Sequence, residues 1–195
     1  MAETEYILEA TNIVKEFPGV HALKGVDLKV KKGEILGLVG ENGAGKSTLM
    51  KCIIGIHPPS SGEIVFDGVQ MKKYSTIDAL NMGISMIQQE LSPIEHRPIM
   101  ENIWIGREPK TKLGLVDHQK MYKMTKDLLS SVGMDEDPKM LVKDLTVAKQ
   151  QMVEIAKAIS YQAKLIIMDE PTSAISGNEI AELFSLMRKV KEEGR

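Results

Sequence analysis

The sequence predicts an α/β protein built around a glycine-rich loop, and three observations support this fold class. The loop, residues 40–48, reads Gly-Glu-Asn-Gly-Ala-Gly-Lys-Ser-Thr and matches the pattern G-x-x-x-x-G-K-[ST]. The apolar run before it, residues 35–39, indicates a buried strand, and residues 49–54 after it indicate a helix. A second apolar run, residues 165–168, ends in two carboxylates. Strand, glycine loop and helix in this order predict a P-loop NTPase.

The N-terminal elements are indicated by alternation and by turn residues. Residues 6–14 and 22–30 alternate in part between apolar and polar positions, and a Phe-Pro-Gly turn at 17–19 separates them. We therefore expect an antiparallel β subdomain at the edge of the fold. Residues 61–68 indicate another short strand that ends in Asp-Gly. The later elements expected outside the middle of the chain are a helix at 76–82, a buried strand at 84–87, a strand at 164–169 and a helix at 178–193.

The middle of the chain differs from the rest in composition and in periodicity. From residue 91 to about residue 149 the sequence is rich in methionine, helical in its periodicity and broken by proline and glycine, at Pro93, Pro98, Pro109, Gly114 and Pro138. We expect an inserted helical subdomain at about 92–149. The core, with its β subdomain, would comprise 1–91 and about 150–195, so that one domain covers 1–195.

The composition restricts the classes of protein to which the chain can belong. Its 195 residues are 43% hydrophobic and 27% charged, as in a globular protein with one substantial core. The net charge of -2 and the lack of a basic run interleaved with aromatic residues disfavour nucleic-acid binding. The single cysteine, Cys52, cannot form an internal disulfide, which fits a reducing compartment. No apolar stretch reaches the roughly 18 residues of a membrane span.

Each residue type in the glycine loop has a chemical role at a bound triphosphate. Glycines at 40, 43 and 45 let the backbone curl with its N–H groups inward, so that phosphate oxygens approach without a Cβ in the way. Lys46 can reach the β- and γ-phosphates, the Ser47 hydroxyl can ligate Mg²⁺, and Thr48 would lie near the α-phosphate. The predicted nucleotide-binding residues of the loop are Gly40, Glu41, Asn42, Gly43, Ala44, Gly45, Lys46, Ser47 and Thr48.

An acidic pair and a glutamine are the candidates for chemistry at the phosphates. Asp169 and Glu170 follow the apolar strand, at the strand end where ligands bind in open α/β sheets. Asp169 would hold Mg²⁺ through its water shell, and Glu170 would polarise the water that attacks the γ-phosphate. Gln89, which follows a buried strand, can ligate Mg²⁺ or a water and link nucleotide binding to motion of the next unit. Gln88 is the alternative residue for this role, and a solvated turn residue is the alternative interpretation of either glutamine.

These motifs, with a third, resemble the ATP-binding subunits of ABC transporters over essentially the whole chain. Residues 145–151, Leu-Thr-Val-Ala-Lys-Gln-Gln, precede Asp169 where that family carries its signature Leu-Ser-x-Gly-Gln. The stretches at 100–107 and 151–158 resemble the monosaccharide importers. The resemblance implies a RecA-like core, ATP and Mg²⁺ as cofactors, and ATP hydrolysis that energises import of a sugar of the galactose/methyl galactoside or ribose class.

The resemblance also assigns roles to single residues. Phe17 matches the aromatic residue that stacks on adenine, although a phenylalanine in a turn also serves as a core residue. Gln89 matches the glutamine that senses the γ-phosphate and contacts the membrane partner. Asp169 and Glu170 match the Mg²⁺-associated and catalytic acids. The residues of the signature that would contact ATP on a partner domain are Thr146, Val147, Ala148, Lys149 and Gln150.

Substitutions in the signature and in one loop depart from the family pattern. Thr146 replaces serine, Ala148 replaces glycine and Lys149 replaces glutamine. Because Ala148 adds a Cβ where the backbone must approach phosphate closely, we expect the composite site completed by this signature to be weak. Residues 173–176 match the loop that crosses the dimer interface, with Ser176 in place of the usual aspartate.

The resemblance implies several partners and a cellular position. These are a second nucleotide-binding domain fused as the C-terminal half, membrane permease subunits and, indirectly, a periplasmic or extracellular sugar-binding protein, with no nucleic acid. The chain would be a peripheral subunit at the cytoplasmic face of the membrane. The apolar residues of 94–105 are expected to be a docking surface for a membrane subunit, the core of the helical subdomain, or a mixture of both.

One feature of the family is missing from the sequence. The family has a switch histidine after the next strand, whereas all four histidines lie upstream of Glu170 and the sequence stops at Arg195. We therefore expect a fragment that binds ATP and hydrolyses it poorly. Two other functions share these motifs: a soluble tandem ABC ATPase acting on the ribosome or DNA, and a non-catalytic nucleotide sensor in which Glu170 is idle.

Overall fold

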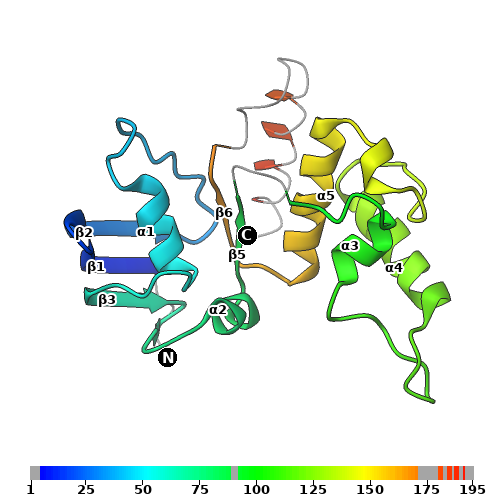
Figure 1. Ribbon diagram of the computed structural model, residues 1–195, viewed down its shortest axis with the longest axis horizontal. Helices are drawn as coiled ribbons and strands as arrows, with labels where there is room; N and C mark the ends of the chain where they lie inside the picture. Colours follow the sequence, from blue (N-terminus) through cyan, green and yellow to red (C-terminus); the bar gives the residue numbers. More distant parts are fainter. Residues whose placement is uncertain are drawn as a thin grey trace. The chain divides into compact units, whose positions relative to one another are not determined.

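Figure 1 shows the computed structural model, which describes residues 5–88, 92–170, 180–181, 184–185, 187–188 and 191. The described residues fall into two compact units. One takes in those of 1–86, 163–169 and 187–195, and the other those of 87–162 and 170–186. The described part of the chain has no helix that is both long and apolar enough to cross a membrane.

The first unit contains a four-stranded antiparallel sheet in the order β2-β1-β3-β4. Strands β1 (Tyr6–Phe17) and β2 (Val20–Lys31) form the predicted hairpin, with Gly19 in the left-handed region at its turn. The predicted strand ending in Asp-Gly is β3 (Ser61–Phe66), which pairs with β1 and, across the turn, with the short β4 (Val69–Gln70).

The core of this unit lies between the sheet and helix α1 (Lys46–Ile53), which directly follows the glycine loop. The helix buries Leu49, Cys52 and Ile53. The apolar side chains of the sheet that form the same cluster include Leu8, Ala10, Ile13, Ile64 and Phe66. Cys52 is fully buried and serves as a small core residue.

Two further predicted strands pair with each other. Helix α2 (Thr76–Met82) begins with a capping box between Ser75 and Asp78 and ends at Gly83, whose φ of 100° only glycine adopts readily. Strand β5 (Ile84–Ile87) follows at once and forms a two-stranded sheet with β6 (Leu165–Met168). The described residues between 180 and 191 are helical, as the apolar spacing there predicts.

The predicted buried strand at 35–39 is wrong in this structure. The segment belongs to neither of the two sheets among the described residues, and Val39 is 93% exposed. An apolar run predicts only a tendency toward burial, and a strand also needs a partner with free backbone groups. Here β5 and β6 pair with each other, and the run beside the glycine loop stays outside their ladder.

The second unit is helical, as the middle of the sequence predicts. It contains α3 (Ile99–Trp104), α4 (His118–Ser131), the short 3-10 helix η1 (Val142–Asp144) and α5 (Val147–Ser160). Because α3 packs against both α4 and α5, this unit continues past the expected boundary near residue 149. Fully buried side chains of these helices include Ile99, Ile103, Met121, Leu129 and Ile155.

The apolar residues of 94–105 divide between core and surface. Ile99 and Ile103 are fully buried, whereas Ile94 and Ile105 are 46% and 45% exposed. Trp104 is half-buried, and its indole N–H donates a hydrogen bond to the Thr125 hydroxyl at 2.9 Å. Part of the set is therefore core, and docking of a membrane subunit by the rest stays a prediction.

Candidate functional site

The glycine loop ends in a backbone geometry that requires glycine. Gly43 and Gly45 have φ values of 81° and 92°, and Gly45 is the N-cap of α1. A Cβ at Gly45 would lie 2.7 Å from the Ala22 carbonyl oxygen and 2.8 Å from a methyl group of Leu23, so neither strand β2 nor the loop has room for one. The loop is thus held against β2, with the N-terminus of α1 at its end.

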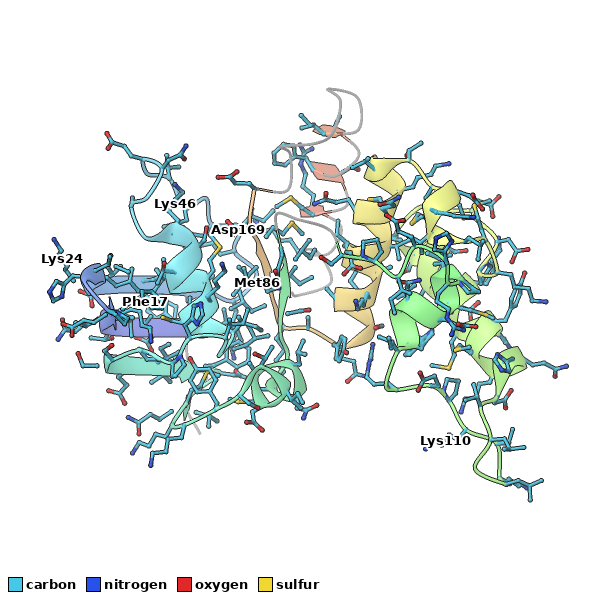
Figure 2. All side chains as sticks on the ribbon, viewed as in Figure 1. Phe17, Lys24, Lys46, Met86, Lys110 and Asp169 are labelled. Atoms are coloured by element: carbon cyan, nitrogen blue, oxygen red, sulfur yellow. The ribbon has the colours of Figure 1, made fainter. Side chains whose placement is uncertain are left out.

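Lys46 folds back across its own loop (Figure 2). Its Nζ donates hydrogen bonds to the carbonyl oxygens of Gly40 at 2.7 Å and of Glu41 at 2.9 Å. Both acceptors are main-chain groups of the predicted site, so the ammonium lies against the first residues of the loop. An ammonium bound only by neutral carbonyls can exchange them for phosphate oxygens, which are stronger acceptors.

Ser47 and Asp169 meet although 122 positions separate them in the sequence. The Ser47 hydroxyl donates to Asp169 Oδ1 at 3.1 Å, and Asp169 is only 8% exposed. The first turn of α1 and the end of β6 thus bring together two of the three groups that the sequence assigns to Mg²⁺, the third being Gln89. Oxygen ligands from one or two side chains, completed by phosphate and water, suit Mg²⁺, so these residues fit the ion. No cluster of three or more His, Cys, Asp or Glu suited to a metal occurs among the described residues.

Glu170 follows Asp169 directly and is exposed. Its φ of 48° is in the left-handed region, which non-glycine residues rarely adopt. The chain therefore turns sharply at the residue to which the sequence assigns activation of water. Gln89 and the loop at 173–176 with Ser176 lie outside the described residues, and their predicted roles remain predictions.

Phe17 is half-buried at the end of β1 and contacts two side chains that sequence reasoning did not connect with it. The His57 ring packs edge-to-face with it, with centroids 5.4 Å apart and an interplanar angle of 85°. The Lys15 ammonium lies 5.0 Å from the centroid of the Phe17 ring. His57 follows α1 in the sequence, and no motif marks it as a neighbour of an aromatic residue on β1. Stacking of Phe17 on adenine remains a prediction.

The signature residues form the N-terminus of α5. Thr146 is the N-cap, and its hydroxyl accepts a hydrogen bond from the Lys149 N–H at 3.4 Å. The Lys149 ammonium pairs with Glu136 at 2.7 Å, and Ala148 is half-buried in the first turn, beside Val147, which is 46% exposed. Thr146 therefore caps its own helix, and a helix N-terminus is present where the resemblance expects phosphate contact.

Known proteins resemble this chain over its whole length. The family model described as ABC transporter matches residues 23–173. The galactose/methyl galactoside import ATP-binding protein MglA of Clostridium tetani is 54% identical over 197 residues, which cover 100% of this chain and 39% of that protein. A putative ribose/galactose/methyl galactoside import ATP-binding protein of Halalkalibacterium halodurans is 53% identical over 97% of this chain and 36% of its own length. The chain thus spans well under half of these relatives.

Solved structures give the same fold. The ADP conformation of MJ1267, an ATP-binding cassette of an ABC transporter, superimposes with a TM-score of 0.86 and 25% identity over 98% of this chain and 79% of that one. A nucleotide-free ATP-binding cassette from an ABC transporter superimposes with a TM-score of 0.85 and 25% identity, over 97% of this chain and 78% of that one. The predicted α/β P-loop fold is confirmed. The chain belongs to the ABC transporter family and has the fold of its ATP-binding cassettes.

Proposed function

We propose that this chain is the ATP-binding and ATP-hydrolysing motor domain that energises import of a monosaccharide of the galactose/methyl galactoside or ribose class. The main support for the proposal is sequence identity: about half of the residues in this chain are identical to those of importer ATP-binding proteins of that class. The meeting of Ser47 and Asp169 beside the glycine loop supports the nucleotide part of it.

The geometry supports a division of labour at the phosphates. The loop N–H groups and the N-terminus of α1 would receive the phosphate oxygens, with Lys46 exchanging its carbonyl acceptors for the β- and γ-oxygens. Ser47 and Asp169 would hold Mg²⁺, which neutralises charge on those oxygens. Glu170 would orient and polarise the attacking water, because phosphoryl transfer needs an in-line nucleophile more than covalent help.

Coupling to transport would need partners beyond this chain. The N-terminus of α5 would contact ATP bound to a second nucleotide-binding domain, fused in the same protein, and closure of the two domains would move membrane permease subunits. A sugar-binding protein would act on the same permease from the other side, with this chain peripheral at the cytoplasmic face. Ala148 would make the composite site completed by this signature the weaker one, and the 195 residues alone would bind ATP and hydrolyse it slowly.

The proposal is tested with the full-length protein assembled with its membrane subunits in proteoliposomes. We expect ATP-dependent uptake of galactose, methyl galactoside or ribose, and we expect Glu170→Gln to retain bound ATP while hydrolysis falls by about a hundredfold or more. Glu16→Gln, which neutralises an exposed glutamate on β1, is the matched control and should transport normally.

Three results would contradict the proposal in different ways. Uptake of none of the three sugars would remove the assigned substrate class. Hydrolysis by Glu170→Gln at the wild-type rate would remove Glu170 as the catalytic base. Stimulation of the ATPase by ribosomes or DNA, and not by membrane subunits, would favour the soluble tandem ATPase.

A further inference from the structure

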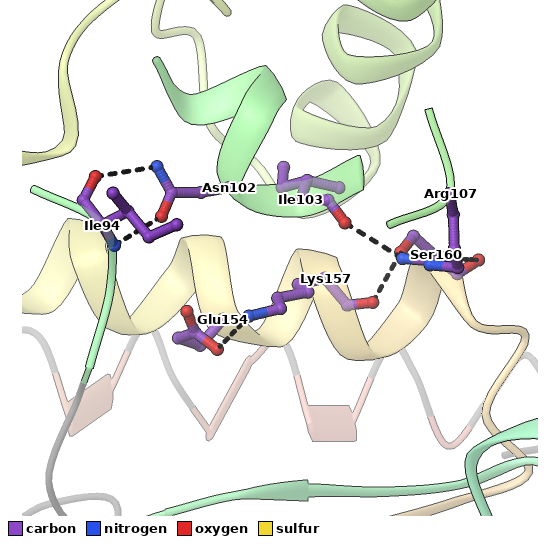
Figure 3. A network of polar contacts seen from close by, with 7 residues as sticks. All are labelled: Ile94, Asn102, Ile103, Arg107, Glu154, Lys157 and Ser160. Atoms are coloured by element: carbon purple, nitrogen blue, oxygen red, sulfur yellow. Dashed lines mark hydrogen bonds and ion pairs between the residues drawn. The ribbon is translucent and has the colours of Figure 1, made fainter. Parts of the chain in front are cut away.

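One buried amide fixes the polypeptide segment that enters the helical unit. Asn102, on α3, is 3% exposed. Its Oδ1 accepts a hydrogen bond from the Ile94 N–H at 2.8 Å, and its Nδ2 donates to the Ile94 carbonyl at 3.1 Å (Figure 3). The same Nδ2 lies 3.1 Å from the Pro98 carbonyl and 3.2 Å from the Arg97 carbonyl. A single side chain thus binds both main-chain groups of Ile94 and closes residues 94–98 onto α3.

The segment held by Asn102 is hydrogen-bonded in turn to the stretch that leads to α5. Four backbone hydrogen bonds join residues 95–100 to residues 138–143: Lys143 N–H to the Glu95 carbonyl (3.0 Å), Val142 N–H to Arg97 (3.2 Å), Ile99 N–H to Met140 (2.9 Å) and Met100 N–H to Pro138 (3.0 Å). Two stretches distant in sequence are therefore joined by backbone hydrogen bonds into one ribbon within the helical unit.

The ribbon ends at the N-terminus of α5. Gln150, in the first turns of that helix, donates from Nε2 to the carbonyls of Val142 and Leu145, each at 3.3 Å. Leu145 is buried and directly precedes Thr146, the N-cap of α5. A continuous set of hydrogen bonds thus runs from Ile94 through Asn102 and the ribbon to the residues of the signature.

We propose that Asn102 is a positioning residue that couples residues 94–98 to the signature at the start of α5. The proposal rests on the proposed function, because the coupling matters where ATP at one motif and a membrane partner at another must be linked. Without the amide, the N–H and carbonyl of Ile94 lose their partner, and residues 92–98 can shift without moving the stretch before α5. The side chain touches no reacting atom and acts through the backbone that it holds.

The other end of α3 supplies a matched control. Arg107 donates from Nη2 to the Ile103 carbonyl at 3.0 Å and to the Ser160 hydroxyl at 2.8 Å, and from Nη1 to the Ser160 carbonyl at 3.2 Å (Figure 3). Its guanidinium carbon lies 3.4 Å from the centroid of the Tyr161 ring. Arg107→Ala therefore loosens the contact of α3 with the end of α5 and leaves the bonds of Asn102 in place. It separates a loss of stability from a loss of coupling.

The first test uses the full-length protein assembled with its membrane subunits. Asn102→Ala is expected to keep the basal ATPase rate and the KM for ATP near wild type, while stimulation by the sugar-loaded binding protein falls by about five- to a hundredfold. Arg107→Ala should keep the stimulation. An equal loss in both variants, or full stimulation in Asn102→Ala, would overturn the positioning role. A wild-type transporter that none of the three sugars stimulates would instead count against the proposed function.

The second test examines the hydrogen-bonded path from Asn102 to α5 directly, and its outcome does not depend on stimulation of the transporter. Amide hydrogen exchange on the 195-residue chain reports the Ile94 and Lys143 N–H groups and the Lys149 N–H at the start of α5. In Asn102→Ala, protection of all three should fall by about fivefold to a hundredfold, the loss of one buried hydrogen bond. In Arg107→Ala it should stay near wild type. Unchanged protection of Lys143 and Lys149 in Asn102→Ala would overturn the proposed path.

Discussion

At the scale of single residues, the glycine loop shows how a backbone geometry fixes residue type. Gly43 and Gly45 both have left-handed φ values, but a Cβ at Gly43 would have no atom within 4 Å, whereas one at Gly45 would collide with the Ala22 carbonyl. Gly40 has no positive φ, and a Cβ there would make an ordinary 3.5 Å contact with Ala44. The three glycines of the motif thus have unequal structural demands.

These demands predict unequal losses of stability. Gly43→Ala should lower the free energy of unfolding by about 1–2 kcal/mol, the penalty for a Cβ in the left-handed region. Gly45→Ala should cost about 1–3 kcal/mol more, because it also overpacks the contact with β2. Urea denaturation of the two variants measures the difference. Equal losses would show that the close approach of the loop to β2 does not exist in solution.

The contacts of Lys46 predict how its substitution changes the affinity for ATP. Its ammonium donates to two loop carbonyls, which are neutral acceptors. Phosphate oxygens can replace them. Lys46→Ala should weaken ATP binding by on the order of ten- to a hundredfold, the range for a hydrogen bond to a charged group. Isothermal titration calorimetry measures this loss. Lys51→Ala, in the last turn of the same helix, should bind ATP like the wild type, and an equal effect there would refute a specific role for Lys46.

The sequence could predict the loop residues because their chemistry requires a fixed spacing, but it could not predict their neighbours. The contact of His57 with Phe17 and the bonds of Asn102 depend on how distant segments pack. No local pattern distinguishes Asn102 from a solvated asparagine on a helix. Such residues are found only once the backbone groups that they bind are known.

At the scale of elements, a charged cluster ties the start of β6 to the antiparallel sheet. Asp67, in the turn between β3 and β4, accepts a hydrogen bond from Lys164 Nζ at 2.7 Å and pairs with Lys32 Nζ at 3.3 Å. The hydrogen bond from Lys164, assisted by Lys32, holds the pKa of the Asp67 carboxyl below its usual 3.8. Because the folded state thus favours the carboxylate, its stabilisation is present above about pH 4 and is lost as the pH falls through the lowered pKa.

The lowered pKa of Asp67 predicts that its contribution to the free energy of unfolding depends on pH. Asp67→Asn should lower the free energy of unfolding by about 0.2–1 kcal/mol at pH 7, a range that allows for solvent screening of a partly exposed pair. The difference from wild type should shrink as the pH is lowered toward 3. Urea denaturation at several pH values measures it, with Asp127→Asn on the exposed face of α4 as the control. A deficit that is independent of pH would contradict the assigned cause.

Several of the predicted elements that hold have local signals at their boundaries. The hairpin of β1 and β2 has alternation and a Pro-Gly turn, and α2 has a capping residue and a terminal glycine. The run at 35–39 has apolar composition alone, and composition does not specify which strand it pairs with. Its failure and the success of β6, another apolar run, show that pairing is decided by the tertiary fold.

At the scale of the whole molecule, two segments far apart in the sequence build one site. Ser47 belongs to the first turn of α1 and Asp169 to the end of β6, and their hydrogen bond closes the distance that the strand-end rule predicts. The sequence could predict this meeting because a phosphate loop and an acidic strand end serve the same ligand. It could not predict the path from Asn102 to α5, because the hydrogen bonds of that path are made to backbone groups, which leave no residue-specific signal.

Binding of Mg²⁺-ATP by Ser47 and Asp169 is tested by isothermal titration calorimetry of the 195-residue chain with ATP, in the presence and in the absence of Mg²⁺. Wild type should bind ATP more tightly with Mg²⁺, whereas Ser47→Ala and Asp169→Asn should still bind Mg²⁺-free ATP but lose most of that gain, on the order of tenfold. Ser130→Ala, on the exposed face of α4, should behave as wild type. A Mg²⁺-dependent gain of the same size in Asp169→Asn as in wild type, or no binding of ATP by the wild-type chain, would contradict the account.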